Sequence, residues 1–258
     1  MKVTILGCGG STGVPLIGNF WGDCDPANPR NRRRRASILV EQDDTTILVD
    51  TSPDLREQLL DARVTRLDAV LYTHGHADHL HGIDDLRSVN YLMDGRAIDI
   101  HADRATLDLI AERFGYVFTE PHPTADLVVY KPTLVPHAIE GPFRVGAIGI
   151  TPFEQDHGYG PTLGFRFGPI AYSTDVKRLP EAAFDTLSGV DTWIVDSLRE
   201  ALHPTHATVG EALDWIARVG PRHAILTHMS QHLDYATLSA KLPPGVEPAY
   251  DGMVIEVP

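Results

Sequence analysis

The chain has 258 residues, of which 43% are hydrophobic, with 19 prolines and 22 glycines. This size fits one α/β domain whose core needs no disulfide framework, and the only two cysteines are Cys8 and Cys24. The formal net charge is −13, from 35 acidic and 22 basic residues. Such acidity argues against a protein that coats long nucleic acid, because contacts to phosphates need a basic surface.

The sequence carries no sign of a membrane segment. The apolar run after Met1 reaches Gly7 within six residues, which is too short for the apolar region of a signal peptide. No run of about 18 apolar residues is available for a membrane span. With so few cysteines, we expect a protein of the reducing cytoplasm.

Short apolar runs typical of strands alternate with amphipathic segments typical of helices. The predicted strands are 2–7, 37–42, 46–50, 68–72, 98–101, 143–153, 162–167, 169–174, 191–196, 223–227, 248–250 and 253–257. The predicted helices are 53–62, 80–93, 103–114, 180–187, 208–219 and 234–241. Crowded strands followed by alternation occur twice along the chain. This order predicts a single domain over 1–258, a four-layer αββα sandwich of two packed mixed β-sheets with outer helices.

Four histidines and an aspartate lie within eight residues, directly after the predicted strand 68–72. They are His74, His76, Asp78, His79 and His81, and the pattern reads H-x-H-x-D-H. Imidazoles and carboxylates packed this closely repel one another or stay unsatisfied unless a cation gathers them. Transition metals take these nitrogen and oxygen ligands. The motif therefore predicts a metal site.

Five other polar residues stand where predicted strands end. His157, Asp175 and His228 follow or close strands of the second half, and Asp50 and Asp196 close two more. Because functional residues of layered α/β folds collect on loops at one edge of the sheets, we expect them to meet there. For Asp50 and Asp196 two interpretations stay open. Each either holds a metal-binding imidazole in the right tautomer or caps the following helix.

One basic run interrupts the acidic sequence, at Arg30–Arg35 with Asn31 inside it. One interpretation is a solvated loop that offsets the acidic surface. The other is a phosphate-facing patch at the mouth of a site, because the forked guanidinium matches phosphate oxygens. Under the second interpretation Arg33 and Arg34 bind substrate.

The H-x-H-x-D-H run and the later His157, Asp175 and His228 together resemble the metallo-β-lactamase superfamily of metal-dependent hydrolases. The stretches 7–15, 71–74, 225–230 and 250–253 resemble its phosphodiesterase branch, which holds ribonuclease Z and a phosphoribosyl cyclic phosphate phosphodiesterase. The resemblance to the cyclic phosphodiesterase runs from end to end. Some members hold an extra structural zinc with three early cysteines. Here that loop has only Cys24, so this zinc is not expected.

The resemblance implies two divalent metal ions about 3.5–4 Å apart with a shared hydroxide between them. Seven side chains are the implied ligands: His74, His76 and His157 on one ion, Asp78, His79 and His228 on the other, and Asp175 between both. The donors suit Zn²⁺ or Mn²⁺, and Fe²⁺ is also compatible. Asp78 is expected to orient the hydroxide. His206, which this branch keeps near the metals, is expected to bind substrate and protonate the leaving oxygen, against the alternative of an ordinary residue at a helix start.

These residues predict a phosphodiesterase that acts on a small phosphate diester, such as a cyclic ribose phosphate or a nucleotide. A lactone or thioester hydrolase with the same metal site is the alternative, and a non-catalytic metal-binding module is a further one. The sequence has no Gly/Lys-rich arm of the kind that clamps tRNA. We expect no long nucleic acid and no membrane as partners. The resemblance is also compatible with a homodimer.

Overall fold

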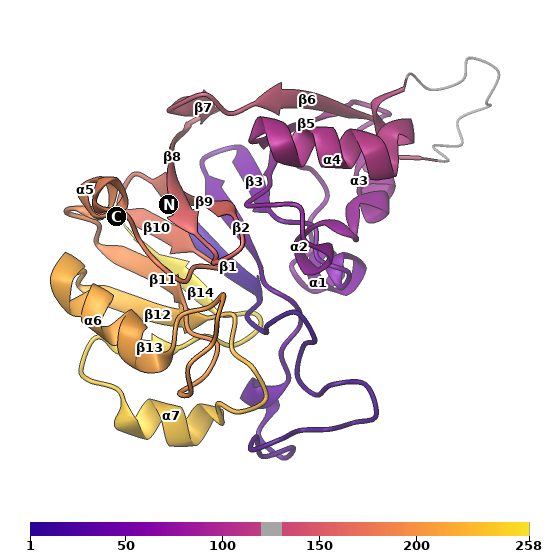
Figure 1. Ribbon diagram of the computed structural model, residues 1–258. Coiled ribbons are helices and arrows are strands. Elements are labelled where there is room, and N and C mark those ends of the chain that lie inside the picture. The colour runs from indigo at the N-terminus through magenta and orange to yellow at the C-terminus, as the bar shows by residue number, and fades with distance from the viewer. Residues whose placement is uncertain (120–130, 258) are drawn as a thin grey trace.

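Two mixed sheets lie face to face, with helices on their outer surfaces (Figure 1). The computed structural model describes residues 1–119 and 131–257. Within these residues each sheet has seven strands. The predicted four-layer αββα arrangement is confirmed.

The first sheet is built mainly from the first half of the chain. Its strand order is β14 (Val254–Glu256), β1 (Lys2–Gly7), β2 (Ser37–Gln42), β3 (Thr45–Val49), β4 (Ala69–Leu71), β5 (Ile98–Ala102) and β6 (Leu134–Ala138). The pairs from β14 to β3 are antiparallel and those from β3 to β6 are parallel. Its helices are α1 (Leu55–Asp61), α2 (Ala77–Leu80), α3 (Leu86–Leu92) and α4 (Arg104–Phe114).

The second sheet comes from the second half. Its order is β13 (Val246–Pro248), β12 (His223–Thr227), β11 (Thr192–Asp196), β10 (Ile170–Ser173), β9 (Pro161–Phe167), β8 (Ile148–Asp156) and β7 (Phe143–Val145). Strands β10 to β13 are parallel, so their carboxyl ends share one edge. The helices of this half are α5 (Glu181–Leu187), α6 (Val209–Val219) and α7 (Tyr235–Lys241).

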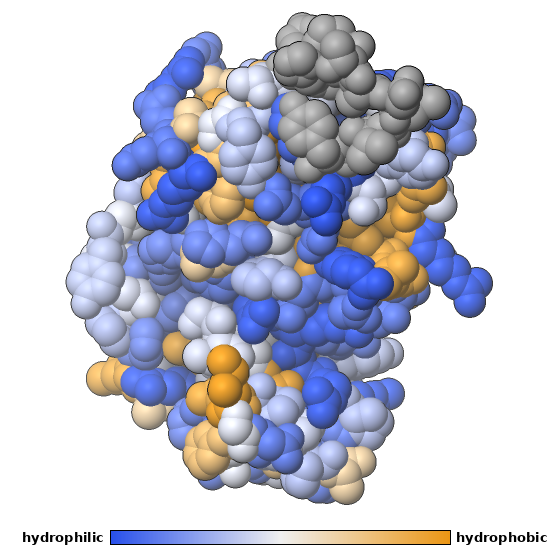
Figure 2. Space-filling view, turned by 90° about the vertical axis from the view of Figure 1, so that its right-hand side faces the viewer, coloured by the Kyte–Doolittle hydropathy of each residue, from blue (hydrophilic) through white to orange (hydrophobic). Residues whose placement is uncertain are grey.

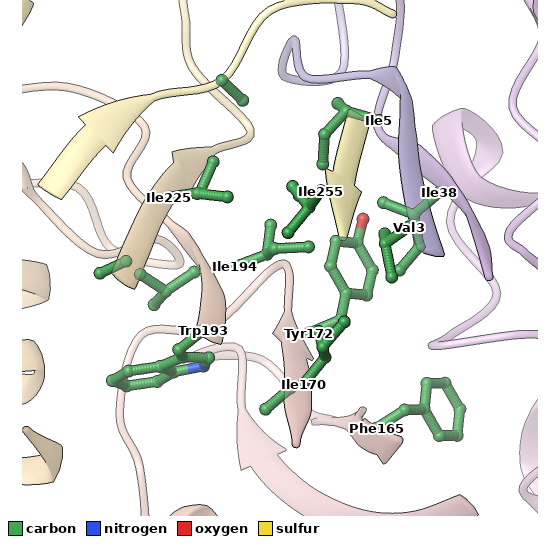
Figure 3. Packing of buried hydrophobic residues seen from close by; sticks show 14 of the residues in the cluster. Val3, Ile5, Ile38, Phe165, Ile170, Tyr172, Trp193, Ile194, Ile225 and Ile255 are labelled. Atoms are coloured by element: carbon green, nitrogen blue, oxygen red, sulfur yellow. The ribbon is translucent and has the colours of Figure 1, made fainter. Parts of the chain in front are cut away.

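The main core fills the space between the sheets (Figure 3). Val3 and Ile38 of the first sheet and Tyr172 and Ile194 of the second are fully buried there. Each fully buried side chain of this size contributes about 1.5–3 kcal/mol to folding. Trp193 is also fully buried, and its Nε1 donates to Ser173 Oγ at 3.0 Å, so the indole carries no unpaired donor. This core fixes the relative position of the two strand edges.

A second apolar cluster joins the first sheet to its helices. It includes Leu55 of α1, Leu86 of α3 and Ile110 of α4, all fully buried. The face formed by these helices and the N-terminal loop is largely hydrophilic, with separate apolar patches (Figure 2). None of the helices described here combines the length and apolar character that crossing a bilayer requires. Cys8 and Cys24 are free thiols, and both are buried.

Three predicted elements differ from the structure and one strand was missed, each for a local reason. Strand β6 was not predicted because Pro136 interrupts it, and β6 lies at a sheet edge, where proline is tolerated. The predicted strand 143–153 is a hairpin, with Gly146 in its turn at φ 50°. The predicted helix 80–93 breaks at Gly82, whose backbone N–H donates to Thr51 O at 2.9 Å. The predicted strand 248–250 lies two residues earlier, at Val246–Pro248.

Candidate metal centre

The seven predicted ligands meet at the edge where the strands of both sheets end. His74 and His76 lie between β4 and α2, whereas Asp78 and His79 lie on α2 itself. The other three follow strands of the second sheet. His157 directly follows β8, His228 directly follows β12, and Asp175 comes two residues after the end of β10. Their ligand atoms form two groups, each within 4.8 Å: His74, His76, His157 and Asp175, and then Asp78, His79, His228 and Asp175.

Asp175 belongs to both groups, and its two oxygens face different sides. Oδ2 lies 3.8 Å from His74 Nε2 and 3.6 Å from His157 Nε2. Oδ1 lies 3.0 Å from His79 Nε2 and 3.2 Å from His228 Nε2. A carboxylate in this position is suited to bridge two cations.

In the first group the imidazoles are oriented by neighbours that leave nitrogen atoms free for a ligand. His157 Nδ1 donates to Thr205 O at 2.7 Å, so its Nε2 carries the lone pair that points to Asp175. His74 Nδ1 is 2.9 Å from Thr73 Oγ1, and its Nε2 is 2.9 Å from His76 Nδ1. The two close nitrogens of His74 and His76 need a shared proton or a cation.

In the second group several buried atoms have no hydrogen-bond partner among the described residues. They include Asp78 Oδ2, His79 Nε2 and His228 Nε2. Asp78 Oδ2 lies 3.2 Å from His79 Nε2 and 3.6 Å from His228 Nε2. An unpaired buried polar group costs about 1–3 kcal/mol. One divalent cation would satisfy all three atoms at once, so this donor set fits a metal ion.

The electrostatics of the cluster favour a cation near Asp175. Burial opposes a charge on His79, yet Asp175, Asp78 and Asp50 outweigh it and hold its pKa well above the usual range. Burial is likewise outweighed at His228, where Asp175 and its other acidic neighbours raise the pKa to about 9. The same carboxylates would stabilise a metal cation bound to these two imidazoles.

Asp50 holds the imidazole of His79, a predicted ligand, as the first of the two interpretations predicts, whereas Asp196 holds that of His206, which is not among the seven ligands. Asp50 accepts from Thr73 N at 2.8 Å and from His79 Nδ1 at 2.7 Å. Asp196 Oδ2 accepts from His206 Nδ1 and from Val176 N, both at 2.9 Å. Asp50 does not cap α1, which begins at Leu55 after Asp54.

Three of these strand-end residues have a left-handed backbone. The φ angles are 64° at Asp50, 51° at Asp175 and 57° at His228. Residues other than glycine rarely adopt this conformation, which costs of order 1–3 kcal/mol where it is strained. In each case the turn follows a parallel strand, β3, β10 or β12, and directs a polar side chain towards the cluster.

His206 lies beside the cluster, in the loop before α6. Its Nε2 is 3.9 Å from Asp175 Oδ2, and its ring stacks on His228 with centroids 4.7 Å apart. The side chain is buried. His81 is exposed and packs on Phe114, away from the cluster.

The two arginines predicted to bind substrate are held by protein groups. Arg33 is 2% exposed, and its guanidinium donates to Leu233 O at 2.6 Å and to Ser230 O at 3.1 Å. Arg34 forms an ion pair with Asp61 of α1. Neither arginine is among the residues that line the groove beside the histidines. For Arg33 the structure corrects the prediction of substrate contact, because Arg33 is a buried tie between the N-terminal loop and the segment after β12.

Replacing Arg33 with methionine should destabilise the fold by about 2–4 kcal/mol, because two buried carbonyls lose their donors. The measurement is the free energy of unfolding in urea. Arg32, which is exposed and lies over the Trp21 ring at 5.4 Å, provides the matched control. Arg32→Met should stay within about 0.5 kcal/mol of wild type. Equal stability of the two variants would contradict the structural role of Arg33.

A groove of about 490 Å³ opens beside the first group of ligands. One wall is α4, with Leu109 and Arg113, and another is the turn between β8 and β9, with Tyr159. His74, His76 and His157 lie at its inner end. Sequence reasoning missed this groove, because α4 carries no motif and its exposed residues look like any solvated helix face.

Known proteins match the part of the chain that carries the seven ligand residues. Residues 45–229 match the sequence family described as Beta-lactamase superfamily domain. A solved structure described as a new diphosphatase from the PhnP family is 32% identical, with a TM-score of 0.89 over 98% of this chain and 96% of that one.

Two curated relatives carry different names. An octanoyltransferase of Porphyromonas gingivalis is 35% identical over 98% of this chain and 51% of its own length. A ribonuclease Z of Bradyrhizobium sp. is 30% identical over 54% of this chain and 46% of its own length. The chain thus spans about half the length of the curated relatives it matches.

Proposed function

This chain belongs to the β-lactamase superfamily, and we propose that it is a metal-dependent phosphodiesterase that acts on a small phosphate diester or nucleotide. The observation that carries the proposal is the position of Asp175, whose two oxygens face two separate groups of buried donors. A site for two cations suits phosphate chemistry, because both the attacking and the leaving oxygen need stabilisation.

The proposed cofactors are two divalent ions, Zn²⁺ or Mn²⁺, with Fe²⁺ also compatible with the donor set. His74, His76 and His157 would hold one ion, and Asp78, His79 and His228 the other, with Asp175 shared. When bound, such ions polarise a phosphoryl oxygen and lower the pKa of water towards neutrality.

The chain's own residues supply the proton transfers. Asp78, as a proposed ligand of the second ion, is also proposed to orient the attacking water beside it. His206 is proposed to contact substrate and donate a proton from Nε2 to the leaving oxygen. Asp196 fixes the opposite nitrogen of His206 by the 2.9 Å hydrogen bond. This bond orients the ring, whose Nε2 lies 3.9 Å from Asp175 Oδ2.

Support for a phosphate substrate comes from the similarity to a PhnP-family diphosphatase and to ribonuclease Z. The net charge of −13 favours a small substrate over long RNA. The volume of the groove, about 490 Å³, matches a ligand of nucleotide size.

Hydrolysis of an acyl thioester or lactone is the second candidate. The groove has apolar lining residues, Ala105, Leu109 and Pro161, which suit an acyl chain. The similarity to an octanoyltransferase points the same way. The same metal site would activate water against a carbonyl carbon.

One experiment separates these candidates. Protein loaded with Mn²⁺ or Zn²⁺ is assayed with bis(p-nitrophenyl) phosphate, an octanoyl thioester and a lactone. The proposal expects turnover of the diester that disappears with a chelator. Turnover of only the acyl substrates would favour the second candidate, whereas bound metal without any turnover would indicate a metal-binding module.

Asp50→Asn should weaken metal binding by about 10–100-fold. Asp50 Oδ2 accepts from Thr73 Oγ1 and His79 Nδ1, and an amide nitrogen placed there would face donors. His79 would then lose the tautomer that presents Nε2 as a ligand. Metal titration of the apoprotein measures the change, with Asp61→Asn, on the exposed surface, as control. Equal affinities in both variants would contradict this role.

We also propose a location in the cytoplasm. Two free buried cysteines fit the reducing cytoplasm. A homodimer is compatible with the family resemblance, and light scattering after gel filtration measures the mass in solution. Long nucleic acid and membranes are not proposed as partners, in line with the strong acidity.

A further inference from the structure

The groove beside the metal centre has a feature that the proposed reaction does not use. Among its described lining residues, Arg113 of α4 is the one permanently cationic side chain. It is exposed, and among the described residues no ion pair to it is found. In a chain of net charge −13, an exposed arginine at the mouth of the site stands out.

Arg113 is fixed relative to the metal ligands. Its Nη1 donates to Gly75 O at 3.3 Å, and Gly75 stands between His74 and His76. Leu109, one turn earlier on α4, lies so close that a Cβ on Gly75 would be 3.0 Å from its Cδ2. Helix α4 therefore packs directly on the ligand loop. The single bond to Gly75 leaves other N–H groups of the guanidinium free to donate.

Two other lining residues, Asp103 and Tyr159, bear on which ligand the groove can hold. Asp103 also lines it, but its Oδ1 accepts from Thr106 N at 2.7 Å as the N-cap of α4. Tyr159, from the turn between β8 and β9, is 87% exposed and presents its ring at the other wall. An exposed aromatic ring offers a stacking surface for a planar group such as a nucleobase.

We propose that Arg113 binds a second phosphate of the substrate, away from the scissile bond, so that the substrate class is a nucleotide bearing an additional phosphomonoester. This inference rests on the proposed function for the identity of the reacting group. Arginine suits the task because its planar fork donates two parallel hydrogen bonds to phosphate oxygens. The bond to Gly75 holds the guanidinium in place before the ligand arrives, which reduces the entropy lost on binding.

The test compares two ligands that differ by one phosphate. Thymidine 3′,5′-bisphosphate and thymidine 5′-monophosphate are titrated calorimetrically into Zn²⁺-loaded protein. The wild type is expected to bind the bisphosphate roughly tenfold more tightly, the gain typical of one charge-assisted contact. Arg113→Met, which keeps the apolar stem, should remove this preference. Arg113→Lys should keep part of it, because the charge remains without the fork.

Arg104→Met is the matched control, since Arg104 is an exposed arginine at the start of α4 that does not line the groove. It should keep the wild-type preference. A preference that persists in Arg113→Met overturns the inference. Equal weakening of both ligands in that variant also overturns it, because such a result assigns Arg113 to positioning the Gly75 loop.

Turnover tests the proposed function separately. The p-nitrophenyl esters of the same two nucleotides, joined at the 5′-phosphate, are the matched substrates. Arg113→Met should raise KM for the ester with the 3′-phosphate and leave kcat close to wild type. If the wild type binds the bisphosphate preferentially yet hydrolyses neither ester, the phosphodiesterase proposal fails while the anion site at Arg113 stands.

Discussion

Asp175→Ala is expected to abolish diester hydrolysis, with a loss of at least roughly 10³-fold in kcat/KM. The reason is geometric, because Oδ1 and Oδ2 of this residue face different imidazole groups at 3.0–3.8 Å. Without the carboxylate, both groups lose their common negative ligand. Metal content by mass spectrometry should fall together with activity.

Asp175→Asn provides a sharper version of this experiment. Asparagine tolerates the left-handed backbone found here, φ 51°, better than alanine does. It keeps one oxygen ligand and replaces the other with a donor. We therefore expect the stoichiometry to fall from two ions to one, with little change in folding. Retention of two ions and full activity in either variant would contradict a bridging role.

His206→Ala should lower kcat by about 10²–10⁴-fold for diesters whose leaving group is an alkoxide. Such a group needs a proton as it departs, and His206 lies beside the cluster with Nδ1 held by Asp196. For p-nitrophenoxide, which departs readily without a proton, the loss should be about tenfold or less. The measurement is kcat across a series of leaving groups of rising pKa.

A neighbouring histidine provides the control. The ring of His203 is 5.1 Å from that of His206, but His203 belongs to neither of the two ligand groups. His203→Ala should therefore show no dependence on the leaving group. If His206→Ala slows all diesters equally, His206 binds substrate or orients its neighbours and does not act as the acid.

The cluster could be predicted from the sequence because its ligands lie either in one short motif or at the ends of several strands. The H-x-H-x-D-H run supplies four ligands within six residues, and parallel strands carry Asp175 and His228 to the same edge. The prediction that polar residues lie at strand ends does not change when a predicted strand boundary is wrong by one or two residues. That robustness explains why the ligands meet even though β13 was misplaced.

Other features depend on contacts between distant segments, which a single sequence does not reveal. A run of arginines looks the same whether a side chain is solvated or, like Arg33, buried against the carbonyls of Ser230 and Leu233. The helix break at Gly82 follows from close packing, since a Cβ there would be 2.0 Å from Ser52 O. The groove beside the histidines likewise depends on α4 packing against the ligand loop, where Leu109 lies close to Gly75.

With two ions bound as proposed, the shared position of Asp175 would also make the protein sensitive to metal supply. Its partners come from both sheets, His74 after β4 and His228 after β12, so bound ions would cross-link the two halves of the molecule. By mass action, a free metal concentration 100 times the dissociation constant adds about 2.7 kcal/mol for one site. Without metal the protein would then be degraded faster by proteases and would also lose its activity. Its abundance in a cell would follow the metal available to it.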